Sequence, residues 1–84
     1  MMTKTEIEQI VNQFMVDDLE IDEELLKPDA RLKEDLKIDS LDYVDIVVLV
    51  DQYFGFKIKL EEIREVKLLS QFYDYIATKV SNQK

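Results

Sequence analysis

A serine between two aspartates is the residue of this 84-residue chain that is best placed for chemistry. The stretch reads Asp39-Ser40-Leu41-Asp42, and a helical pattern of apolar residues follows it directly. Since Asp39 is a good helix N-cap, the Ser40 hydroxyl should lie in the first helical turn, near the positive end of the helix dipole. Free backbone N–H groups at that end favour a phosphate, so Ser40 is well placed to carry a phosphodiester.

The same serine is poorly placed to be a catalytic nucleophile. The chain contains no His and no Cys, which excludes Ser-His-Asp catalysis, thiol nucleophiles and zinc–thiolate sites. The flanking carboxylates of Asp39 and Asp42, with ordinary pKa values of about 4, are weak bases for a serine. We therefore expect no catalytic residue in the chain, no enzymatic activity, and activation of Ser40 by another protein.

Composition and charge narrow the class of partner. With 46% hydrophobic residues the chain should fold, and its length fits one domain over residues 1–84. A formal net charge of −8 disfavours nucleic acids and anionic membranes as partners and favours proteins with a basic face. The longest apolar run, Ile46–Val50, is far too short to span a membrane, and no signal peptide is apparent. We expect a cytoplasmic monomer.

The acidic residues after the first helical segment do not form a calcium loop. Asp18, Glu20 and Asp22 have the alternating spacing of calcium ligands, but Glu23 stands where the loop requires Gly. We therefore expect no dedicated metal site.

Four helical segments are expected. The first begins at Thr3 or Thr5, each of which starts a capping-box pattern, and ends near residue 16. A loop of about twenty residues with one short helical turn follows. The second helix runs from the Asp39 cap to Gly55, a short third helix covers about 60–65, and the last covers about 69–80, without a capping residue at its start. These segments predict an all-α fold. We expect the four tyrosines at the edge of the core with their hydroxyls in water.

The chain resembles the acyl carrier proteins, in which an Asp-Ser-Leu core opens the second helix of a four-helix bundle. Besides Asp39-Ser40-Leu41, the resemblance includes the preceding Asp35-Leu36, Phe54-Gly55 at the helix end, and Asp74-Tyr75-Ile76 near the C-terminus. It covers nearly the whole chain. It implies a four-helix bundle with a long loop between helices 1 and 2 and a short third helix. The implied function is to carry acyl intermediates as thioesters in fatty acid, related lipid or polyketide biosynthesis.

The resemblance also implies roles for individual residues. Ser40 becomes the attachment site of 4′-phosphopantetheine, transferred from coenzyme A by a phosphopantetheinyl transferase. Other partners are acyl-transferring and chain-elongating enzymes with basic docking patches. Recognition of these enzymes falls to residues of the second helix and its cap: Asp39, Leu41, Asp42, Asp45, Val48 and Asp51. The interior that shelters an acyl chain would be lined by Leu36, Ile38, Ile46, Val47, Val50 and Ile58.

One departure from the family pattern affects the site, and two alternatives remain. The family usually has Gly two residues before the Asp of the Asp-Ser pair, whereas this chain has Lys37, which carries a cost if the position needs a positive φ. An aminoacyl or peptidyl carrier would share the arm, but such carriers commonly have Gly-Gly and His before the serine. In an unmodified acidic helical adaptor, Ser40 would be only a helix cap.

Overall fold

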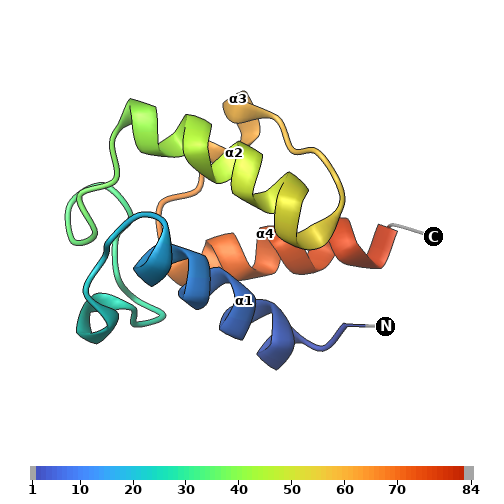
Figure 1. Cartoon of the computed structure of the whole chain (residues 1–84), viewed down its shortest axis with the longest axis horizontal. Helices are drawn as coiled ribbons and strands as arrows, with labels where there is room; N and C mark the ends of the chain where they lie inside the picture. The colour runs from blue at the N-terminus through green and yellow to red at the C-terminus, as the bar shows by residue number, and fades with distance from the viewer. Residues whose placement is uncertain (1, 83–84) are drawn as a thin grey trace.

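Four α-helices and one 3₁₀ turn make up the regular structure of residues 2–82, which are the residues that the computed structural model describes (Figure 1). In chain order they are α1 (Lys4–Asp17), the turn η1 (Glu23–Leu25), α2 (Ser40–Phe54), α3 (Leu60–Ile63) and α4 (Leu69–Asn82). Helix α1 packs against α4, and α3 packs against α2. The predicted all-α fold, with a long connection before the second helix and a short third helix, is confirmed.

Of the two possible N-cap residues, Thr3 and Thr5, the structure uses Thr3 to begin α1. The Thr3 hydroxyl accepts a hydrogen bond from the Glu6 N–H at 3.2 Å, and the Glu6 carboxylate accepts one from the Thr3 N–H at 2.8 Å. These hydrogen bonds hold the pKa of Glu6 below its ordinary value. The capping box satisfies free N–H groups at the start of α1, which packs one apolar face into the core. That face carries Ile7, Val11, Phe14 and Met15.

The long loop between α1 and α2 is fixed to the bundle by several of its apolar side chains. Ile21, Ala30, Leu32, Leu36 and Ile38 are all buried, with exposed fractions of 9% or less. The predicted short helical turn is η1, which begins at the Asp22 side-chain cap. This loop delivers the chain to the start of α2, so its anchoring determines where Ser40 lies.

The start of α4 has an unexpected set of partners. The Leu69 N–H donates to the Ala30 carbonyl at 2.9 Å, and the Ser70 N–H donates to the Pro28 carbonyl at 3.0 Å. The Gln71 side-chain oxygen accepts from the N–H groups of Lys67 and Leu68, at 3.1 Å each. The long loop and Gln71 therefore replace the capping residue that the local sequence lacks.

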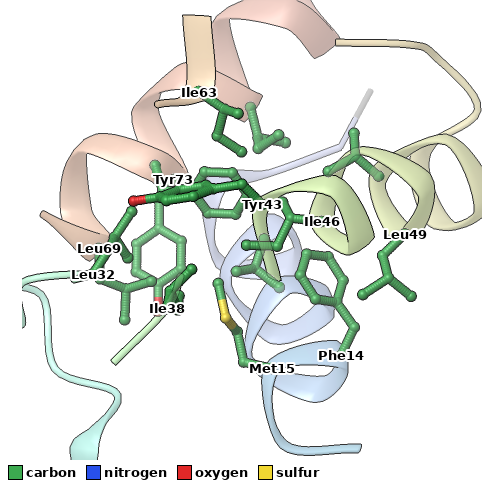
Figure 2. Close-up of a cluster of buried hydrophobic side chains, with 14 of the residues drawn as sticks. Phe14, Met15, Leu32, Ile38, Tyr43, Ile46, Leu49, Ile63, Leu69 and Tyr73 are labelled. Atoms are coloured by element: carbon green, nitrogen blue, oxygen red, sulfur yellow. The ribbon is translucent and has the colours of Figure 1, made fainter. Parts of the chain in front are cut away.

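The core is hydrophobic throughout the described residues, with one polar atom that has no partner (Figure 2). Tyr43 and Tyr73 are only 2% and 4% exposed, so their predicted position at the core edge, with hydroxyls in water, is wrong. The Tyr73 hydroxyl donates to Asn12 Oδ1. The Tyr43 hydroxyl is buried without a hydrogen-bond partner among the described residues. Tyr53, 41% exposed, does lie at the surface.

Candidate functional site

Ser40 is the first residue of α2, and its side chain is exposed. The residue before it makes the cap: Asp39 Oδ1 accepts from the N–H groups of Leu41 and Asp42 at 3.0 and 3.1 Å. Asp42 returns a hydrogen bond, since its Oδ2 accepts from the Asp39 N–H at 3.1 Å. Because this capping box is complete without Ser40, the serine hydroxyl is not needed to begin the helix and is accessible to another protein.

The chain reaches Ser40 through a tightly bonded turn. Arg31 pairs with Asp35 through two side-chain contacts of 3.2 and 3.3 Å, and its backbone N–H also donates to Asp35 Oδ2 at 2.8 Å. The Arg31 guanidinium and N–H hold the pKa of the Asp35 carboxyl below its ordinary value. The Ile38 N–H then donates to the Leu32 carbonyl at 2.9 Å. These bonds fix the turn that ends one residue before the Asp39 cap.

Lys37 has a positive φ of 57°, the left-handed conformation that favours glycine. Leu36 and Ile38, on either side of Lys37, both enter the core, while Lys37 itself remains exposed. The cost expected for a lysine at this position is therefore present. In return, an ammonium group lies three residues before Ser40, on the exposed side of the turn.

The outer face of α2 combines apolar and acidic side chains. Leu41, Val44 and Val48 are 75%, 48% and 51% exposed, and the spacing of these residues places them in one strip along the helix. Asp45 and Asp51 are exposed beside this strip, Asp39 is exposed at its start, and Asp42 is half-buried. All six residues predicted for recognition thus reach the surface in one region. Val44, which the sequence did not single out, is exposed in the same strip.

The six residues predicted to shelter an acyl chain are part of the core. Leu36, Ile38, Ile46, Val50 and Ile58 are buried, and Val47 is partly buried against them. In this structure they pack with the side chains of α1 and α4 in one contiguous cluster. A sheltered chain would therefore have to displace or separate these side chains.

The fold and site define a class: a small all-α domain with an exposed serine at the start of its second helix. Comparison with known proteins identifies the family to which the chain belongs. The sequence profile described as "Phosphopantetheine attachment site" matches residues 9–76. The chain is 35% identical over 80 residues to the acyl carrier protein of Thermosynechococcus vestitus, covering 95% of this chain and 99% of that one.

Two further relatives agree. The acyl carrier protein of Rubrobacter xylanophilus is 33% identical over 75 residues, which is 89% of this chain and 93% of the relative. The protein named acyl carrier protein AcpXL of Rhizobium meliloti is 42% identical over 67 residues, or 75% and 70% of the two chains. This chain belongs to the acyl carrier protein family. It carries acyl groups as thioesters on a phosphopantetheine arm in lipid synthesis.

The residues at the start of α2 fit such an arm. An exposed serine hydroxyl that the helix cap does not use can be esterified without unfolding the helix. When attached, the cofactor supplies a thiol, which a chain without Cys cannot provide.

Members of the acyl carrier protein family are carriers and not catalysts. Within residues 2–82, no helix is long and apolar enough to cross a membrane.

Proposed function

We propose that Ser40 is the attachment site of the phosphopantetheine arm. The observation that supports this assignment is the division of roles at the start of α2, where Asp39 caps the helix and leaves the exposed Ser40 hydroxyl unused. The same observation disfavours an unmodified adaptor in which Ser40 is only a cap. The chain has no base suited to deprotonate Ser40, so a separate transferase must supply it, and the chain itself is not an enzyme.

The attachment reaction forms one phosphodiester. The Ser40 oxygen attacks the phosphorus on the pantetheine side of the coenzyme A diphosphate. The bond from that phosphorus to the bridging oxygen breaks, adenosine 3′,5′-bisphosphate leaves, and the serine proton passes to a base of the transferase. The product is a phosphodiester at the positive end of the α2 dipole, which stabilises its negative charge.

The outer face of α2 is proposed to dock the partner enzymes. The exposed strip of Leu41, Val44 and Val48 supplies apolar contact, and the carboxylates of Asp39, Asp42, Asp45 and Asp51 attract a basic surface. The partners are the transferase and the acyl-transferring and chain-elongating enzymes. Such encounters are steered by charge and weaken as salt is added. A single-domain cytoplasmic monomer that meets these enzymes in turn fits this role.

The cargo is proposed to be an acyl chain of fatty acid synthesis or of a related lipid or polyketide pathway. The segment Lys37-Ile38-Asp39 lacks the Gly-Gly and His that commonly precede the serine of aminoacyl and peptidyl carriers. The buried cluster around Ile46 and Val50 offers only apolar contacts to a chain that enters it, which suits a hydrocarbon.

Intact-mass measurement tests the attachment site. The protein is incubated with coenzyme A, magnesium and a broad-specificity phosphopantetheinyl transferase. The wild type should gain one phosphopantetheine, and Ser40→Ala should gain none. Ser70→Ala is the matched control, because it removes a serine hydroxyl from the start of another helix and should leave the mass gain unchanged. A folded wild-type protein that gains no mass, or a Ser40→Ala variant that gains it, would show that the assignment is wrong.

A further inference from the structure

A cavity of about 420 Å³ lies between the loop after Ala30 and the segment that joins α3 to α4. Although the whole chain has a net charge of −8, four of its eleven cationic residues line this one cavity. They are Arg31, Lys33, Arg64 and Lys67. This volume lies within the range of small-molecule sites. We call the cavity the basic pocket.

The two walls of the basic pocket are joined by backbone hydrogen bonds. Arg31 and Leu68 form an antiparallel bridge, and the Leu32 N–H donates to the Lys67 carbonyl at 2.9 Å. Directly beyond it, the Leu69 N–H donates to the Ala30 carbonyl. The backbones that carry Arg31 and Lys67 are therefore held at a fixed separation, so a ligand would not have to order them on binding.

The basic pocket is rich in hydrogen-bond donors. The pair with Asp35 orients the Arg31 guanidinium, while Lys33, Arg64 and Lys67 form no ion pair among the described residues. Gln71 also lines the pocket, and because its side-chain oxygen already accepts two backbone N–H groups, its amide NH₂ remains available as a donor. One lining carboxylate, that of Glu34, opposes these groups.

The charges indicate what kind of ligand fits. Glu34 and the Asp35 partner of Arg31 offset two of the four cations and leave two positive charges. A monocarboxylate would neutralise only one of them, whereas a phosphate monoester carries a charge near −2 at neutral pH and three acceptor oxygens. The half-buried side chains of Val66 and Leu68 supply apolar contact for the carbon portion of such an ester.

We propose that the basic pocket binds a small phosphate monoester. This site is separate from the Ser40 hydroxyl and does not depend on its modification. Two sources share this chemistry: a free phosphorylated metabolite, and the 3′-phosphate of coenzyme A when the transferase brings that donor to the protein.

Titration of the ¹⁵N-labelled protein with inorganic phosphate, followed by amide chemical shifts at constant ionic strength and pH 7.5, tests the basic pocket. The shift changes should saturate and should be confined to residues 31–34 and 64–71. The double variant Arg64→Gln/Lys67→Gln removes two exposed, unpaired cations and should weaken binding about tenfold or more, as expected for the loss of charge-assisted hydrogen bonds. Its amide spectrum reports directly whether it remains folded.

The matched control is Lys27→Gln/Lys57→Gln, which removes the same charge from exposed lysines outside the basic pocket. It should bind phosphate within about twofold of the wild type, since screening leaves only a weak long-range effect. Shift changes that never saturate, that spread to Lys27 and Lys57, or that both double variants reduce equally would overturn the proposal.

A second titration compares coenzyme A with dephospho-coenzyme A, which lacks only the 3′-phosphate. Tighter binding of coenzyme A than of both dephospho-coenzyme A and inorganic phosphate supports the pocket and identifies the donor as its ligand. Saturable phosphate binding without that preference supports the pocket for a free phosphate ester. Neither titration involves Ser40, so a negative result here leaves the intact-mass test of the arm unaffected.

Discussion

At the scale of single residues, neighbouring side chains at the site have separate tasks. Asp39 begins the helix, Ser40 is left exposed, and Lys37 adopts a left-handed backbone conformation between two buried neighbours. The sequence predicted the cap and the exposed hydroxyl, because both follow from local hydrogen bonding. It also indicated a possible cost at Lys37, but only the structure shows that this position has a positive φ.

The two buried tyrosines give a prediction at this scale. Tyr43→Phe removes a hydroxyl that has no partner, so it should raise the free energy of unfolding by about 1 kcal/mol, whereas Tyr73→Phe removes a hydroxyl bonded to Asn12 and should lower it by about 1 kcal/mol. Urea unfolding of both variants beside the wild type measures the difference. If Tyr43→Phe were also destabilising, its hydroxyl would have a partner that the packing does not reveal.

At the scale of elements, the sequence predicted what is local and missed what is distant. The bounds of α2 follow from the Asp39 cap and from Gly55, whose φ of 81° ends the helix. The start of α4 at Leu69 was predicted, but its partners were not, because Ala30 and Pro28, which accept its first hydrogen bonds, lie about forty residues away in the sequence. Periodicity likewise could not show which apolar side chains of α2 face outward, since nearly the whole circumference of the helix is apolar.

At the start of α2, Asp39 caps the helix and is also proposed to help dock the partner enzymes. Two substitutions of Asp39 separate its effect on stability from its effect on docking. Asp39→Asn keeps an N-cap and should change stability by less than about 0.5 kcal/mol, whereas Asp39→Ala loses the cap and should cost about 1 kcal/mol. Both remove the same charge, so both should weaken docking to the basic transferase at low salt. Thermal unfolding and the KM for the carrier measure the two effects.

Asp45→Asn is the matched control for docking, because Asp45 is exposed on the same helix and plays no part in the cap. It should raise the KM of the transferase without altering stability. Should Asp39→Asn retain the wild-type KM while Asp39→Ala raises it, the carboxylate of Asp39 would act through the helix cap alone.

At the scale of the whole molecule, charge is distributed unevenly. Acidic side chains flank the apolar strip on the exposed face of α2, while four cations gather at the basic pocket beside the start of α4. A chain with a net charge of −8 could therefore present surfaces of opposite sign to two kinds of ligand. The composition predicted the acidic surface, because the net charge of −8 is a sum over the whole chain. The second could not be predicted, since Arg31 and Lys67 become neighbours only through the bridge between Arg31 and Leu68.

This excess of acid makes the pH dependence of stability the sum of two opposing effects. Protonation of carboxylates relieves their mutual repulsion, which stabilises the fold, but it also breaks the interactions that lower the pKa of Asp35. Because that folded-state pKa lies below the unfolded value of about 4, the contribution of Asp35 is complete above pH 4 and is lost as the pH falls through the folded-state pKa. Subtracting the curve of a variant isolates this contribution.

Asp35→Asn is that variant, since the amide oxygen can still accept from the Arg31 N–H while the charge is gone. Urea unfolding from pH 7 to pH 3 should find the variant less stable than the wild type at pH 7. The gap should stay constant down to about pH 5 and narrow below about pH 4, until the pH has fallen through the folded-state pKa of Asp35. Curves that remain parallel to pH 3 would show that the charge of Asp35 adds no stability to the turn before Ser40.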